Sequence, residues 1–125
     1  MKEIAVNGFT LETDDELISA LITKTGVPSL KCKADGKGIC KDGFMISLAT
    51  ITKGAFVNSG PMVSSLNATS TKVKADGIFV LRVDDETDTI GGITGVILTN
   101  PSGATEIVYF KVKITNAGQS VVKAN

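Results

Sequence analysis

The sequence of 125 residues contains no histidine, no tryptophan and only one tyrosine. The absence of histidine excludes Ser-His-Asp and Cys-His nucleophile activation as usually built, and also metal sites ligated by histidine. An enzyme would have to work with carboxylates, lysine or tyrosine alone, and no constellation of such residues supports one. We therefore expect a protein that is not an enzyme and that holds no metal and no cofactor.

An excess of charge and a long apolar run are also missing. Thirteen basic and thirteen acidic residues give a formal net charge of zero, whereas phosphate binding needs a clear excess of Lys and Arg. Nucleic acid is therefore not an expected partner. No apolar run approaches the roughly 18 residues that span a bilayer, and the first residues, MKEIAVNGF, show no signal-peptide pattern. We expect a chain that is made and kept in the cytoplasm.

What the sequence does have is Val, Ile and Thr interrupted by thirteen glycines, a composition typical of β-rich proteins with frequent turns. The length favours one domain with a modest core. From residue 29 onwards the chain alternates between short apolar segments and turn residues, as expected for many short strands. We predict a small, mostly β single domain over residues 1–125, with residues 1–26 as an N-terminal extension and residues 27–125 as the β body.

One short α-helix is predicted in the N-terminal extension, over TDDELISALITKTG at residues 13–26. Thr13 followed three residues later by Glu16 is the pattern of a capping box. The apolar residues after it recur at i, i+1, i+4 and i+5, which forms one apolar face of a short helix; they are Leu17, Ile18, Leu21 and Ile22.

Three stretches have the outline of the same β-hairpin. STKVKADGIFVLRVDDET (70–87) turns at Asp76-Gly77, SLKCKADGKGICKDG (29–43) turns near Asp35-Gly36, and IAVNGFTLETDDE (4–16) turns at Asn7-Gly8. The C-terminal QSVVKAN looks like a fourth start that stops at its turn. Because the spacing of the turns is irregular, it excludes an open solenoid of fixed period and favours a closed, cone-like, pseudo-threefold arrangement. The alternative is that favourable turn sequences recur by chance.

The stretch SGPMVSSLNATSTKVKADGIFVLRVDDET, residues 59–87, resembles the repeat of PAAR proteins, the sharp tips of contractile injection spikes in type VI secretion systems and phage tails. That family typically has Gly-Pro, then Ser-x-Thr-Val-x-x-x-Gly, then Pro-Ala-Ala-Arg-x-Gly-Asp. The residues that match are Gly60, Pro61, Ser70, Gly77, Arg82 and Asp85. The sequence departs from the family at 79–81, where Phe-Val-Leu replaces Pro-Ala-Ala. Because it also lacks histidine, the metal of the family's apex does not carry over.

The resemblance implies a mechanical function. A PAAR protein is a small cone whose base caps a trimeric β-helical spike, one copy per trimer, and sharpens it for membrane puncture. It implies the trimeric spike protein as partner, effector cargo as a further partner, and membrane contact only transiently on injection. The chain would assemble from the cytoplasm into an injection particle or virion. The rival interpretation is a generic phage or bacterial β-domain that binds another assembly partner.

Cys32 and Cys40 lie on opposite arms of the hairpin at 29–43. With a three-residue loop they would face each other and could form a cross-strand disulfide. With a two-residue loop they would be one position out of register. Reduced cysteine is the default in the cytoplasm, so both states stay open at this point.

Overall fold

The computed structural model describes all 125 residues and contains short β-strands, one 3-10 turn and no α-helix. The elements are β1 (Lys2–Glu3), β2 (Thr10–Thr13), β3 (Ser19–Lys24), β4 (Lys33–Ala34), β5 (Lys37–Gly38), β6 (Met45–Lys53), β7 (Phe56–Asn58), β8 (Met62–Asn67), β9 (Lys74–Ala75), β10 (Ile78–Phe79), β11 (Glu86–Thr87), η1 (Gly92–Thr94), β12 (Val96–Thr99), β13 (Thr105–Val108), β14 (Val112–Asn116) and β15 (Lys123–Ala124). The prediction of a small, mostly β single domain is confirmed.

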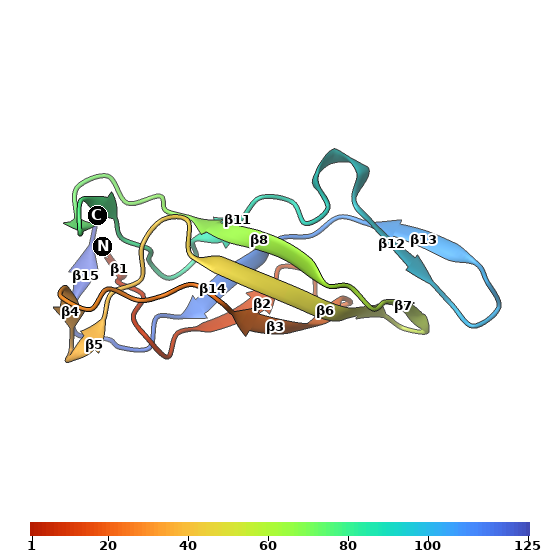
Figure 1. The fold of residues 1–125 in the computed structure, drawn as a ribbon, viewed down its shortest axis with the longest axis horizontal. Coiled ribbons are helices and arrows are strands. Elements are labelled where there is room, and N and C mark those ends of the chain that lie inside the picture. Colours follow the sequence, from red (N-terminus) through yellow and green to blue (C-terminus); the bar gives the residue numbers. More distant parts are fainter.

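The molecule is elongated, and its two ends differ (Figure 1). One end carries β1, β4, β5 and β15 together with both chain termini, and the other carries the hairpin of β12 and β13. Between them, a nine-stranded antiparallel sheet runs in the order β13-β12-β7-β6-β8-β11-β14-β2, with β3 paired to the other edge of β6. Since β2 and β3 are also in contact, six strands nearly enclose the space between them: β3, β6, β8, β11, β14 and β2.

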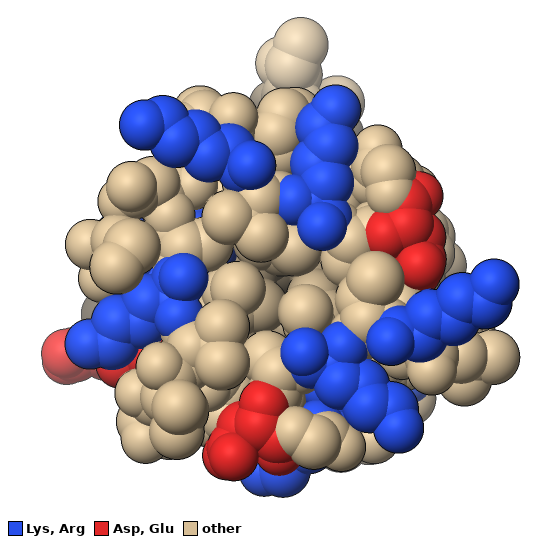
Figure 2. Space-filling model, turned by 90° about the vertical axis from the view of Figure 1, so that its left-hand side faces the viewer, with Lys and Arg blue, Asp and Glu red and all other residues tan.

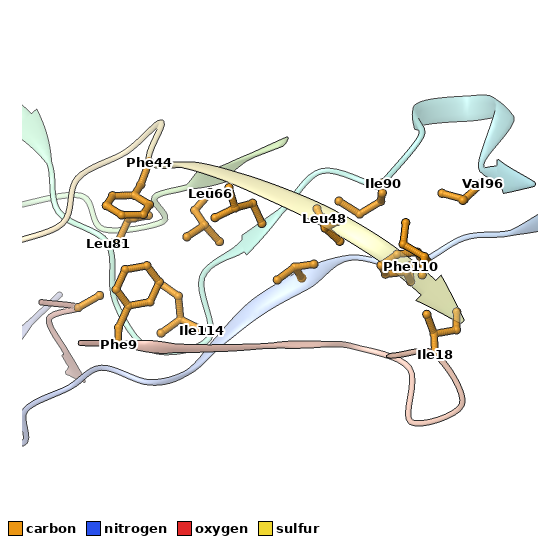
Figure 3. Close-up of a cluster of buried hydrophobic side chains, with 14 of the residues drawn as sticks. Phe9, Ile18, Phe44, Leu48, Leu66, Leu81, Ile90, Val96, Phe110 and Ile114 are labelled. Atoms are coloured by element: carbon orange, nitrogen blue, oxygen red, sulfur yellow. The ribbon is translucent and has the colours of Figure 1, made fainter. Parts of the chain in front are cut away.

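Apolar side chains from these strands and from the segments that connect them fill that space. The main core contains 17 buried residues, and the rings of Phe9 and Phe44 meet edge to face with centroids 5.2 Å apart. Phe9, Phe44 and Leu81 lie together nearest the hairpins, whereas Ile18 and Phe110 lie at the far end (Figure 3). Phe9, Ile18, Phe44, Leu81 and Phe110 lie just outside the strands. Alternating strand positions supply other core residues, as in β6, where Ile46 and Leu48 are buried.

The helix predicted at residues 13–26 is wrong, because this segment forms a tight turn and then β3. The Thr13 hydroxyl donates to the carbonyl oxygens of Asp15 (2.9 Å) and Ile18 (2.7 Å), so it closes the turn and caps no helix. From Ser19 the chain pairs with β6, with a register irregularity between Ser19 and Leu21. Burial alternates along it: Ile18 is buried, whereas Leu17 and Leu21 are 69% and 64% exposed. A spacing of i, i+4 places two side chains on the same face both in a helix and in a strand. The strand forms because β6 offers an edge with which this segment can pair.

Two of the three predicted hairpins are confirmed. β4 pairs with β5 and β9 with β10, each across a two-residue turn. Both turn residues have positive φ, 52° and 75° at Asp35-Gly36 and 52° and 80° at Asp76-Gly77. These values are typical of the type I′ turn that fits the twist of a hairpin.

The hairpin predicted around Asn7-Gly8 is wrong. β1 pairs with β15 at the other end of the chain, and β2 pairs with β14. Only Gly8 of the two turn residues has positive φ, so a type I′ turn does not form. The Phe9 amide donates to the Val6 carbonyl (3.0 Å), and the resulting turn leads the chain from the hairpin end into the body. Residues 1–26 thus contribute strands both to the hairpin end and to the main sheet.

Candidate functional site

The end that carries the short hairpins is the most regularly built part of the molecule, and we define this hairpin end as residues 1–6, 29–41, 70–82 and 119–125. At its centre three backbone hydrogen bonds form a closed ring. The amide of Ala5 donates to the carbonyl of Leu81 (2.9 Å), Leu81 donates to Cys40 (3.0 Å), and Cys40 donates to Ala5 (2.9 Å). Each of three chain segments therefore gives one bond and receives one.

Further backbone contacts around this ring recur in all three segments. Three antiparallel bridges link the segments pairwise: Ile4 with Arg82, Val6 with Ile39, and Lys41 with Val80. Three further amides donate from segment to segment in the opposite direction to the ring: Asn7 to Gly38 (2.9 Å), Asp42 to Phe79 (2.9 Å) and Val83 to Glu3 (3.0 Å).

A second, smaller core lies beneath the hairpins. It contains seven buried residues, Ile4, Val6, Ala34, Ile39, Ala75, Val80 and Ala124. The three alanines are 1% to 3% exposed, and each follows an exposed lysine in the first strand of its pair: Lys33, Lys74 and Lys123. The pair β15–β1 brings the two ends of the chain together. Lys123-Ala124 in β15 occupies the position that Lys33-Ala34 has in β4 and Lys74-Ala75 has in β9.

Polar side chains hold the chain where it enters each hairpin. The hydroxyl of Ser29 accepts hydrogen bonds from the backbone amides of the residues two and three positions later (3.3 and 2.9 Å). The side-chain oxygen of Gln119, Oε1, accepts the corresponding two bonds (both 2.8 Å). The buried Ser70 hydroxyl donates to the Val80 carbonyl (2.6 Å), and the side-chain nitrogen of Gln119, Nε2, donates to the Ile4 carbonyl (2.8 Å). Ser29, Ser70 and Gln119 thus serve related purposes in the three units.

Arg82 and Asp85, two residues of the family motif, are connected through Thr69. The Asp85 side chain is 1% exposed and accepts hydrogen bonds from the Arg82 amide (2.9 Å), the Thr69 amide (3.4 Å) and the Thr69 hydroxyl. The Arg82 guanidinium donates to the Thr69 hydroxyl (2.7 Å) and to the Ala124 carbonyl (3.2 Å). This network ties the second hairpin to the C-terminal strand, and the motif alone gave no sign of Thr69.

The remaining motif residues divide between two places. Ser70 and Gly77 lie in the same hairpin unit as Arg82, with Gly77 in the turn of β9–β10. Gly60 and Pro61 lie between β7 and β8, joined by a cis peptide bond, and a Cβ at Gly60 would lie 2.8 Å from the Leu48 carbonyl oxygen in the main sheet. The structure therefore gathers Ser70, Gly77, Arg82 and Asp85 but not Gly60 and Pro61.

Cys32 and Cys40 are both free thiols. The turn between their arms is the two-residue one, so Cys32 lies opposite Ile39 and is one position out of register with Cys40, as the backbone bond from Ile39 to Cys32 shows. The Cys32 thiol donates to the Asp76 carboxylate at 3.6 Å. Burial raises the pKa of the Cys40 thiol to about 12, despite the opposing effect of Lys24 and Lys41.

Charge is strongly segregated along the molecule although the total is zero. The hairpin end holds nine basic side chains against three acidic ones, a formal +6, and the rest of the chain holds four against ten, a formal −6. Figure 2 shows this end face-on, with basic side chains distributed around its circumference and few acidic side chains between them.

The opposite end exposes apolar side chains on a free sheet edge. Ile97 and Ile107 face each other across β12 and β13 and are 56% and 53% exposed, and Tyr109 continues the face at 58%. β13 is the last strand of its sheet, so one side of its backbone has no partner strand.

No protein-family model matches the chain, and neither a curated protein nor a solved structure is significantly similar to it. No three His, Cys, Asp or Glu side chains lie close enough together to hold a metal ion. The structure also has no helix of the length and apolarity needed to span a bilayer.

Proposed function

We propose that the protein is a non-enzymatic tip of PAAR-like type that caps a trimeric β-helical spike, one copy per trimer, and sharpens the spike for membrane puncture. The observation that carries the proposal is the closed ring of hydrogen bonds through Ala5, Leu81 and Cys40. A ring in which three segments of one chain make the same contacts in turn corresponds to a pseudo-threefold axis along the molecule.

The rest of the hairpin end supports the same axis. The buried Ala34, Ala75 and Ala124 occupy corresponding positions in three two-stranded pairs. In sequence terms the third unit is QSVVKAN followed by MKEIAVNG, residues 119–125 continued by residues 1–8. The pattern that stops at the C-terminus is therefore completed by the N-terminus.

The body supports the axis too. Each hairpin is entered from one strand of the main sheet and left into another: β3 and β6 for the first, β8 and β11 for the second, and β14 and β2 for the third. These six strands alternate around the core in the order β3-β6-β8-β11-β14-β2. A single chain with three related faces can contact each subunit of a threefold partner in a similar way, a match that a chain without internal symmetry lacks.

In this proposal the hairpin end is the apex and the opposite end is the base. The apex has compact hairpins with their own buried core. The base has the free edge of β13 and the exposed Ile97, Ile107 and Tyr109. Free edges and apolar side chains are features that a partner covers by strand addition and burial.

The motif residues act structurally in this proposal. Asp85 and Arg82 fix the second hairpin against β15, and Ser70 satisfies the Val80 carbonyl. Their replacement would loosen the apex without removing any catalytic step.

The experiment is affinity purification of the tagged chain from the source cells, followed by mass measurement of the intact complex. An N-terminal tag lies at the hairpin end (Figure 1) and leaves the base free. The proposal expects one copy of this chain with three copies of one spike protein. Recovery of a symmetric homo-oligomer, or of a complex with any other ratio, would refute it and favour a β-domain that binds another assembly partner.

A further inference from the structure

We propose that the hairpin end binds anionic lipid surfaces, with its lysines on the phosphates of acidic headgroups and its exposed apolar side chains between them. This inference goes beyond the capping of a spike, because the isolated chain would bind such a surface without any spike. It rests on the charge, the exposure and the placement of the side chains at this end.

Six lysines of the hairpin end are exposed and take part in none of the four ion pairs of the structure: Lys31, Lys33, Lys37, Lys72, Lys74 and Lys123. Each lysine close to an anionic membrane surface strengthens binding about fivefold, the equivalent of about 1 kcal/mol. The chain therefore carries a set of cations at one end that no group of its own neutralises.

These lysines come from all three hairpin units. Lys33, Lys74 and Lys123 hold the same place in β4, β9 and β15, immediately before the buried alanine. Because the lysines surround the end (Figure 2), an end-on approach brings several of them to a flat surface together. The formal −6 of the remainder of the chain is repelled by the same surface and favours that orientation.

Apolar side chains are exposed among the lysines. Leu30 and Val121 are 86% and 72% exposed, and Ile78 and Phe79 of β10 are 44% and 36% exposed. The Lys74 ammonium lies 4.7 Å from the centroid of the Phe79 ring. Lysines with apolar residues between them are typical of surfaces that enter the headgroup region, and the lysine stems can extend so that the ammonium stays at the phosphates.

The same features favour lipid over nucleic acid. Arginine is the residue of choice for nucleic-acid recognition, and single strands are held by stacking on aromatic side chains. The only arginine of the chain, Arg82, is engaged with Thr69 and Ala124, and Phe79 is the only aromatic residue in the hairpin end.

The experiment is co-sedimentation of the full chain with vesicles of phosphatidylcholine alone or of equimolar phosphatidylcholine and phosphatidylglycerol. We expect binding only to the anionic vesicles, and a strong loss of it between about 0.1 M and about 1 M salt, where the Debye length falls from about 10 Å to about 3 Å. The triple variant Lys33→Gln, Lys74→Gln, Lys123→Gln should bind about 100-fold more weakly, three factors of about five.

The matched control removes the same charge from the body, through Lys53→Gln, Lys111→Gln and Lys113→Gln. Two of these lysines form surface ion pairs, which contribute little to stability, and the control should bind within about threefold of the wild type. Equal binding to neutral vesicles, or equal losses in both triple variants, would overturn the proposal. So would tighter binding to a DNA duplex or a single strand under the same conditions. None of these results depends on a spike, so the failure of this proposal is distinguishable from that of the capping function.

Discussion

Replacing Ile4 with alanine should destabilise the protein as strongly as the same change at Ile39 in the first hairpin. A residue four positions from a chain end ordinarily tolerates substitution, because termini fray. Here Ile4 is 2% exposed in the small core and its amide donates to Val122 (3.0 Å), while Ile39 is 8% exposed and its amide donates to Cys32 (3.0 Å). The two residues therefore occupy corresponding places in two hairpin units.

The magnitude follows from the groups removed. Isoleucine to alanine deletes three carbon atoms, and about 0.8 kcal/mol per buried CH₂ gives about 2.4 kcal/mol for transfer alone. The cavity adds to this, because three hairpins packed on each other cannot close it independently, and the total should reach about 3 kcal/mol, within the observed range of about 2–5 kcal/mol. Ile93 is 97% exposed, and Ile93→Ala is the matched control, with an expected cost below about 0.5 kcal/mol.

Urea unfolding followed by circular dichroism measures the three variants against the wild type. The midpoints of Ile4→Ala and Ile39→Ala should fall by similar amounts at unchanged slope, which shows a change in stability and not in the surface exposed on unfolding. If Ile4→Ala behaves like Ile93→Ala, the chain ends do not complete a third hairpin, and the reasoning from the hydrogen-bond ring fails.

Three further predictions concern single groups. Asp85→Asn should lower the free energy of unfolding by about 1–3 kcal/mol, because a buried acceptor of three hydrogen bonds becomes partly a donor. The control Asp84→Asn, at the neighbouring exposed position, should lower it by less than about 0.5 kcal/mol, and equal urea midpoints for the two variants would contradict the network. An alkylating reagent at pH 8 should modify Cys32 but not Cys40 of the folded chain, because the buried Cys40 thiol, with its pKa raised to about 12, stays protonated; peptide masses that show both labelled at similar rates would refute this. Gly38→Ala should cost about 1–3 kcal/mol, because its Cβ would lie 2.5 Å from a backbone carbonyl oxygen of the opposite arm, and thermal unfolding unchanged from the wild type would count against that packing.

The sequence predicted the elements in which local chemistry decides the structure. Asp35-Gly36 and Asp76-Gly77 can adopt positive φ at both turn positions, so β4–β5 and β9–β10 form where the turn residues place them. The mostly β class follows similarly from composition and frequent turns.

The wrong predictions concern segments whose structure is determined by pairing with a strand far away in the sequence. Leu17 to Ile22 fit a helix and a strand about equally, and only the edge of β6, more than twenty residues away, selects the strand. The arms beside Asn7-Gly8 alternate as a hairpin should, but β15 and β14 from the other end of the chain take them as partners. The pattern did contain a usable signal, since Lys123-Ala124 repeats the Lys-Ala dipeptide that precedes the Asp-Gly turns at 35–36 and 76–77.

The net charge of the whole chain did not indicate how charge is distributed over the folded protein. The sum of zero gave no reason to expect an electrostatic surface, yet nine of the thirteen basic residues lie in four short stretches that the fold brings to one end. Arg82 and Asp85 were identified from the motif, whereas Thr69, which connects them, belongs to no motif and depends on the approach of two loops.

The most direct test of the central claim is the mass of the intact complex formed by this chain with its partner from the source cells. A trimer of one β-helical protein carrying a single copy of this chain is the result that the proposed capping function predicts. A complex in which this chain is present in equal copies with its partner, or only with itself, would contradict the account.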